Sequence, residues 1–225
     1  MARAKQPATF VEPTGLPPQV TRVAALLSRL PGVGFKASAK HAQWFATQPF
    51  SIATELAEAL IKMTEVVRIC VQCGNLTEQV KPQVDDEETI MVPLCSICTD
   101  PKRDPSIVCV VATIGNLLSF EKAGTWKGLY FVLGKLLSPL DGISADELPI
   151  DLLVNLLTPG MEVVLAFPDS VDGNATGLCL ARELMGTGVK VTQLSAGVSY
   201  GADLDFADAV TLGNALKRRV EVKPS

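Results

Sequence analysis

Two pairs of closely spaced cysteines constrain the fold of this 225-residue chain more than any other feature of its sequence. Cys70 and Cys73 form the first C-x-x-C pair, and Cys95 and Cys98 form the second. Zn²⁺ favours four soft donors in a tetrahedron, which two such turns on adjacent loops supply. Because all four expected ligands are cysteines, no coordination position remains for a catalytic water. The spacing predicts one structural zinc ion per chain, with two disulfides or four free thiols as the alternative interpretations.

The residues around the cysteine pairs fit a structural role for this section. Gly74 and Asn75 follow Cys73 directly, and both tolerate the left-handed backbone that a tight turn needs. The rest of the section is expected to be irregular, with the acidic run 85–88 in solvent. Cys109 and Cys179 have apolar neighbours, so we expect them in the core rather than in a reactive site.

The distribution of charge matters more than the net charge of −4, which is too negative for a protein that coats nucleic acid by bulk charge. Residues 1–69 carry eight Lys and Arg against four Asp and Glu, whereas the sections 70–110 and 111–225 each have a balance of −4. Only the N-terminal third is therefore biased toward phosphate.

That N-terminal third is expected to be helical. Residues 1–18 contain four prolines and are predicted to form a flexible tail. Apolar residues then recur at helical spacing, which predicts three helices. These expected helices cover residues 19–30, 35–46 and 52–68.

The turn between the first two expected helices resembles the helix-hairpin-helix element of many DNA-binding proteins. Gly32 and Gly34 let the backbone pass close to a phosphate, and the free amides at the start of the next helix can donate to it. Lys36 and Lys40 lie one turn apart and add positive charge on the same face. Such contacts carry no base information, so the predicted binding is independent of sequence. A plain helix-loop-helix turn is the alternative.

From residue 106 onward, continuous apolar strands alternate with helices, which predicts an α/β domain with a parallel sheet covered on both faces. The expected strands are 107–111, 129–133, 163–167 and 189–194, and the expected helices are 114–123, 150–157 and 174–185.

The turn after the third of these strands resembles the acidic turn of Toprim domains, whose catalytic members hold magnesium on carboxylates. Ala112 stands where those enzymes have a glutamate, and Asp172 and Asn174 supply only one carboxylate and one amide. A hard cation would find few ligands here, so a metal-free sheet domain is expected. His41 is the only histidine, and the sequence contains neither a P-loop nor a G-x-S-x-G motif.

A hairpin element, a four-cysteine site and a Toprim-like sheet follow one another in the order found in the RecR family of recombination mediator proteins. The similarity extends over about residues 22–222 and includes five short segments of similar sequence. These segments are Ile69–Glu78, Cys95–Ile107, Gly128–Gly134, Ser138–Ile143 and the Walker B-like segment Gly201–Asp208. On this resemblance the predicted parts are the tail 1–18, a helical domain 19–69, a zinc module 70–105, a Toprim-like domain 106–196 and a C-terminal segment 197–225.

The resemblance implies a non-enzymatic protein of recombinational DNA repair. RecR proteins form ring-shaped homo-oligomers that encircle DNA, and they work with RecO and RecF to help RecA displace single-strand-binding protein at gaps. The family's DNA-contacting basic pair matches Lys36 and Lys40, although Phe35 replaces a proline and Lys40 replaces an arginine. If the acidic face of the Toprim domain serves partner docking, Ala112 alters docking on RecF.

Two other functions remain as alternatives. A Toprim-type enzyme that cuts or joins DNA is disfavoured by Ala112 and Asn174, and a zinc-stapled interaction module without a DNA role is disfavoured by Lys36 and Lys40. The sequence has no run of about 18 apolar residues and its start lacks the apolar stretch of a signal peptide, so a cytoplasmic location without membrane contact is expected.

Overall fold

The computed structural model describes residues 15–78, 92–194, 211, 213 and 214. The chain divides into two compact units, Met1–Val66 and Val67–Ser225, and each is described by itself. The acidic run 85–88, the Walker B-like segment 201–208 and most of the tail 1–18 lie outside the described residues. Among the helices that the structure describes, none combines the length and apolar character needed to span a membrane.

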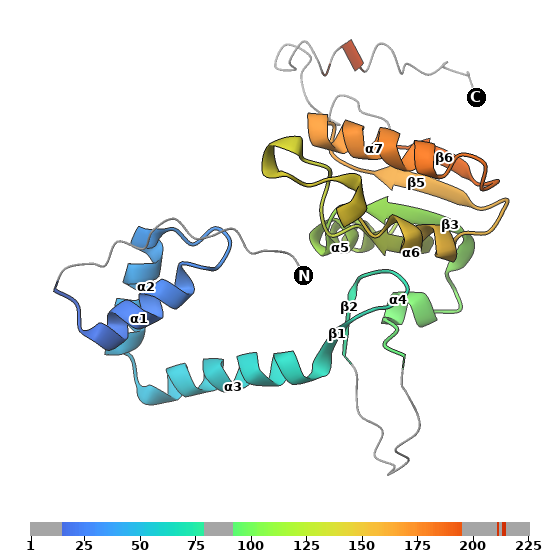
Figure 1. Cartoon of the computed structure of the whole chain (residues 1–225). Coiled ribbons are helices and arrows are strands. Elements are labelled where there is room, and N and C mark those ends of the chain that lie inside the picture. Colours follow the sequence, from blue (N-terminus) through green and yellow to red (C-terminus); the bar gives the residue numbers. More distant parts are fainter. Residues whose placement is uncertain (1–14, 79–91, 195–210, 212, 215–225) are drawn as a thin grey trace, which may run out of the picture. The chain divides into compact units, whose positions relative to one another are not determined.

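The first unit contains three helices, α1 (Pro18–Leu27), α2 (Phe35–Thr47) and α3 (Phe50–Val66) (Figure 1). Pro18 begins α1 at a position where a missing backbone N–H costs nothing. The helix was expected to reach Leu30 but ends at Leu27, because the following amides make tighter turn bonds, such as Leu30 N–H to the Leu27 carbonyl at 3.1 Å.

The beginning of the second unit is more regular than the sequence suggests. The third expected helix was wrong at its end, because residues 67–69 leave the helix and form strand β1 (Val67–Ile69). This strand pairs antiparallel with β2 (Leu76–Glu78), in the register Val67↔Glu78. In the second cysteine pair, Cys95 is the N-cap of α4 (Ser96–Thr99) and Cys98 lies within this helix. A section expected to be irregular therefore contains a short hairpin and one helical turn.

The rest of the second unit is a four-stranded parallel sheet, which confirms the predicted α/β class. Its strands lie in the order β4 (Gly128–Val132), β3 (Asp104–Val111), β5 (Glu162–Ala166) and β6 (Lys190–Gln193). The connecting helices are α5 (Ile114–Ala123), α6 (Ile150–Leu156) and α7 (Val171–Glu183), with 3-10 turns at Pro139–Asp141 and Ala145–Glu147. Helix α7 begins three residues earlier than expected, because the Ser170 hydroxyl caps it by accepting a bond from the Gly173 amide at 3.1 Å.

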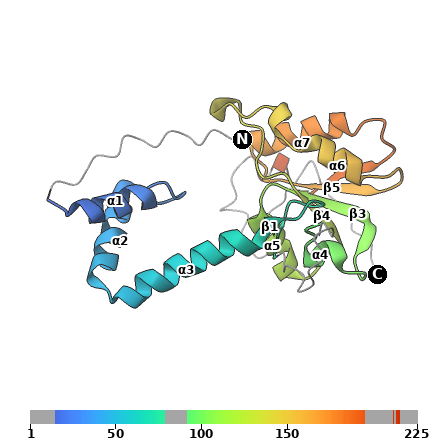
Figure 2. The same ribbon diagram turned by 60° about the horizontal axis from the view of Figure 1, so that its bottom comes forward.

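Each face of the sheet has its own apolar core, as the alternation of side chains along a strand requires. Figure 2 shows α6 and α7 on one side of the strands and α5 with α4 on the other. Val108, Val110 and Phe131 face the core that includes Leu153 of α6 and Leu180 of α7. The opposite face carries a second core, formed by Cys109, Val111, Tyr130, Val132, Leu117 of α5 and three of the paired cysteines. The four-cysteine module therefore packs on the sheet as part of its core.

Candidate functional site

The four paired cysteines converge in the structure. Their sulfur atoms all lie within 4.8 Å of one another, and the other candidate ligands among the described residues form no comparable group. Cys70 Sγ lies 3.8 Å from Cys98 Sγ, and Cys73 Sγ lies 3.5 Å from Cys95 Sγ. A tetrahedron with metal–sulfur bonds of about 2.3 Å has edges of about 3.8 Å, whereas a disulfide bond is only about 2.05 Å long. The cluster could hold a metal ion, and its spacings do not fit two disulfides.

The first cysteine turn is fixed by its backbone. The Cys70 amide donates to the Asn75 carbonyl at 2.7 Å, and the Gly74 amide donates to the Cys70 carbonyl at 2.9 Å. Gly74 has the expected left-handed conformation, with φ of +77°, and a Cβ there would lie 2.9 Å from the Val132 carbonyl oxygen. Asn75 would also tolerate this conformation but does not adopt it; its side-chain oxygen instead accepts a bond from the Leu76 amide at 2.8 Å.

The cysteine module is tied directly to the edge strand β4. The Val132 amide donates to the Cys73 carbonyl at 2.8 Å, so the first turn continues the hydrogen bonding of the sheet. Cys70, Cys73 and Cys95 are almost completely buried. This burial removes the sulfurs from solvent, which suits a structural site rather than a catalytic one.

The crowding of the sulfurs perturbs their ionisation. The hydrogen bond with Cys95 raises the pKa of Cys73 to about 12, while the bonds from Cys73 and Cys98 hold the pKa of Cys95 well below its ordinary value. Four thiolates cannot share so small a volume without a cation, because like charges disfavour one another. Cys109 is buried in the core as expected, and this burial raises the pKa of its thiol to about 12.

A polar network that the sequence did not reveal links the second cysteine turn to the sheet. Arg103, five residues after Cys98, donates to both carboxylate oxygens of Glu121 on α5, at 2.9 and 2.5 Å. The buried Tyr130 of β4 donates its hydroxyl to the same carboxylate at 2.7 Å. The Arg103 bond lowers the pKa of Glu121 below its usual range. These partners are 18 and 9 residues apart in sequence, so no local pattern could identify them.

The carboxyl end of the sheet holds the residues compared with the Toprim acidic turn. Ala112 is buried after β3, Asp172 lies in the first turn of α7, and both line a crevice of about 600 Å³. The side chain of Asn174 donates to Asp169 at 2.9 Å and does not line this crevice. Asp141 is a further carboxylate at the crevice. The structure therefore does not bring Asp172 and Asn174 together as a ligand pair.

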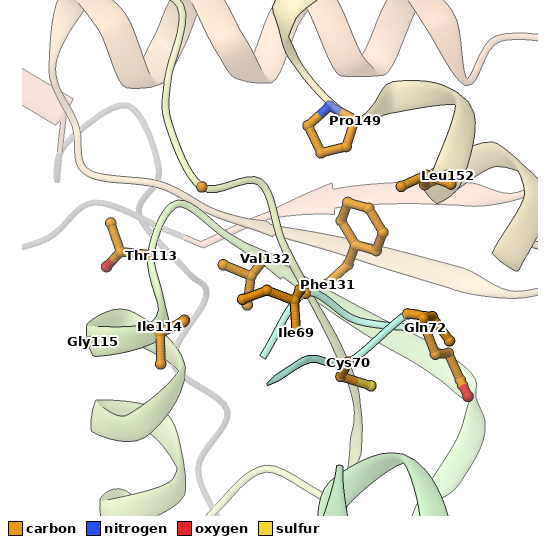
Figure 3. A pocket seen from close by; sticks show the side chains of 13 residues that line it. Ile69, Cys70, Gln72, Thr113, Ile114, Gly115, Phe131, Val132, Pro149 and Leu152 are labelled. Carbon is orange, nitrogen blue, oxygen red and sulfur yellow. The ribbon is translucent and has the colours of Figure 1, made fainter. Parts of the chain in front are cut away.

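A second hollow of about 740 Å³ lies beside the first cysteine turn and is mostly apolar. Figure 3 shows Ile69 and Cys70 from the cysteine module, Phe131 and Val132 from β4, and Pro149 and Leu152 near α6 around it. None of the described residues that line it is charged. No site residue predicted from the sequence uses this hollow except Cys70.

The hairpin residues lie at the start of α2 in the first unit. Gly32 has φ of +78°, which a residue with a Cβ rarely adopts, and Gly34 is the N-cap of the helix. The amide of Ser38 donates to the Gly34 carbonyl at 3.0 Å, so the amides before it belong to the open first turn. Lys36 and Lys40 are both exposed.

The charge around this turn is entirely positive. Residues 15–49 contain no Asp or Glu, and they carry four cations, which are Arg22, Arg29, Lys36 and Lys40. All four side chains are exposed. Positive charge is therefore more concentrated in residues 15–49 than in residues 1–69 as a whole, because the acidic residues of 1–69 lie in the tail and in α3.

Together, the parallel sheet and the four-cysteine cluster define the class of the molecule, a Toprim-type α/β protein with a metal-binding module. Residues 106–195 match the Toprim domain model, and residues 197–220 match the model of the RecR C-terminal region. The chain belongs to the RecR family of recombination proteins.

Three curated relatives illustrate how far the similarity extends. The recombination protein RecR of Leifsonia xyli subsp. xyli is 40% identical over 199 residues, which cover 87% of this chain and 93% of that protein. The RecR protein of Deinococcus radiodurans is 36% identical over 206 residues, covering 92% and 88%. That of Myxococcus xanthus is 38% identical over 205 residues, covering 90% and 98%. The family similarity therefore includes the hairpin, the cysteine module and the sheet.

Proposed function

We propose that this protein is a non-enzymatic DNA-binding clamp of recombinational DNA repair, which helps RecO and RecF load RecA at single-stranded gaps. The relatives named recombination protein RecR support the repair role. The hairpin of the first unit is the proposed DNA contact, and a ring-shaped homo-oligomer in the cytoplasm is the proposed working form. The predicted parts 19–69, 70–105, 106–196 and 197–225 serve as the hairpin domain, zinc module, Toprim-like domain and C-terminal segment.

The observation that carries the DNA-binding proposal is the start of α2. Gly32 and Gly34 leave the backbone accessible, the first-turn amides supply the positive end of the helix dipole, and Lys36 and Lys40 add two exposed charges. Phosphates are the groups that such an arrangement binds best, and they carry no sequence information. One hairpin offers few contacts, so several hairpins in one ring would raise the affinity by multivalency.

The metal of the cysteine cluster is proposed to be Zn²⁺, with Cys70, Cys73, Cys95 and Cys98 as ligands and one ion per chain. Four thiolate donors with tetrahedral spacing favour Zn²⁺ over hard cations such as Mg²⁺ or Ca²⁺. The ion would hold the second cysteine turn against the first and so complete the core on one face of the sheet.

The absence of catalysis is proposed from the chemistry of the crevice at the sheet. Ala112 provides no carboxylate where catalytic Toprim enzymes have one, and Asn174 is bonded to Asp169. Among the described residues that line the crevice, only Asp172 and Asp141 carry carboxylates, which are few ligands for a magnesium-dependent cleavage of the Toprim type. The alternative enzyme would need a reactive group that the described residues of this crevice do not supply.

Fluorescence anisotropy with labelled gapped DNA tests the proposed binding. The Lys36→Ala/Lys40→Ala double variant should keep its metal and its helical content but lose most of its DNA affinity, to a similar extent for unrelated sequences. A Lys62→Ala variant is a matched control, because Lys62 is exposed on α3 beside Glu65 at 4.0 Å and away from the hairpin turn in sequence. Equal affinity of the double variant and the unmodified protein at every salt concentration would show that DNA is held elsewhere.

A further inference from the structure

Trp44 is an exposed aromatic residue on the same helix as the proposed phosphate-binding lysines. Its side chain is 48% exposed, which is unusual for the largest apolar side chain. Single exposed apolar residues are common and need no explanation by themselves. Trp44 differs from the other exposed apolar residues of the first unit in its position relative to Lys36 and Lys40.

Helical geometry places the three residues on one stripe. Lys36, Lys40 and Trp44 follow one another at intervals of four residues, so each lies about 40° around the helix from the previous one. The residues that α2 buries are Ser38, Ala39 and Ala42, which lie on the opposite face. Helical side chains lean toward the N-terminus, so the indole extends over the turn that carries Lys40.

The indole is also held in place. Its ring meets the Phe45 ring edge-on, with centroids 5.0 Å apart and an angle of 74° between the planes. An aromatic pair in this arrangement limits the freedom of both rings. A rigid, half-exposed ring loses little conformational entropy when a flat ligand stacks on it.

From this geometry we propose that Trp44 stacks on an unpaired DNA base beside the phosphates bound by Lys36 and Lys40, so that the hairpin prefers single-stranded over duplex DNA. The inference rests on the proposed DNA-binding function and adds the form of DNA that this site takes. A basic stripe without acidic residues attracts the backbone, and the aromatic ring accepts any base, since every base has a π face. Bases inside a duplex are already stacked and cannot reach the ring.

The test compares affinities of oligothymidylate and a blunt duplex with the same number of phosphates. Trp44→Ala should weaken oligothymidylate binding about 5- to 150-fold, which is the contribution of one stacked base, and leave duplex binding unchanged. Trp44→Phe should recover part of the loss because it keeps an aromatic face. Phe50→Ala is the control, since Phe50 is 84% exposed but lies on α3, outside the stripe.

A direct reading comes from fluorescence of a Trp126→Phe variant, in which Trp44 is the only remaining tryptophan. Oligothymidylate should quench its emission at saturation, and the duplex should not. Unchanged affinity of Trp44→Ala for oligothymidylate, or an equal loss on both DNAs, would overturn the proposal. A lower oligomer mass of Trp44→Ala in light scattering, with unchanged DNA affinity per subunit, would also overturn it, because Trp44 would then contact another copy of the chain. If Lys36→Ala/Lys40→Ala still binds both DNAs normally, the proposed DNA site itself fails instead.

Discussion

Replacing Glu121 with glutamine tests whether the Arg103 network holds the cysteine module on the sheet. Glu121 accepts two bonds from Arg103 and one from the buried Tyr130. The side chains of Arg103 and Glu121 are only 15% and 27% exposed. Breaking a fully buried ion pair costs about 3–5 kcal/mol. Partial exposure reduces this cost, so we expect a loss of about 2 kcal/mol in the free energy of unfolding of the second unit.

Urea unfolding of proteins that also carry Trp44→Phe measures this loss by the fluorescence of Trp126, the only tryptophan left, whose ring centroid lies 6.2 Å from that of Tyr130. Glu147→Gln is the control, since its bond with Lys135 is at the surface and should matter little. The folded state lowers the pKa of Glu121, so the stabilisation is present above the unfolded value of about 4.3 and disappears as the pH falls through the lowered pKa. If the urea midpoint of Glu121→Gln at neutral pH shifts no more than that of Glu147→Gln, this account of the network is refuted.

Three further changes probe the metal site and the crevice. Cys95→Ser should abolish stoichiometric metal and destabilise the second unit, because assembly of such a site is coupled to folding; elemental analysis that finds no zinc in the unmodified protein would exclude the site altogether. Gly74→Ala should destabilise the protein by more than about 1 kcal/mol, and by more than the control Gly124→Ala. Both glycines have positive φ, but only at Gly74 would the added Cβ lie 2.9 Å from a carbonyl oxygen. Equal urea midpoints of the two variants would contradict this. Supercoiled DNA incubated with protein and magnesium should remain intact, and nicking that disappears in Asp172→Ala would overturn the non-enzymatic interpretation.

Much of the fold was predictable because long apolar patterns dominate it. The expected helix 114–123 agrees with α5 residue for residue, and its ends carry local signals. Thr113 and Asn116 form a capping box, and Gly124 ends the helix with φ of +67°. Strands β4 and β5 and the second half of β3 were found within a few residues because they are almost entirely buried and read as continuous apolar runs, whereas β6 contains no fully buried residue.

Short elements and long-range pairs were not predictable in the same way. β1 and β2 have three residues each, too few to establish a period, so the first was assigned to the preceding helix. Arg103 and Glu121 are 18 residues apart in sequence, and only the tertiary fold brings them into contact. At the candidate site, the cysteine spacing led directly to the cluster because every ligand is in the motif itself. Trp44 belongs to no sequence motif. Its proposed role follows only from its exposure on the same helical stripe as Lys36 and Lys40.

The salt dependence of DNA affinity tests the central claim most directly, namely that DNA is held by phosphate contacts at the start of α2. The logarithm of the binding constant of the unmodified protein should fall linearly with the logarithm of the salt concentration. Each lysine–phosphate contact contributes a slope of about −0.7 on single strands and about −0.9 on duplex DNA. For every hairpin engaged, the Lys36→Ala/Lys40→Ala variant should therefore show a slope shallower by about 1.4 to 1.8. Parallel lines for the two proteins would contradict the account.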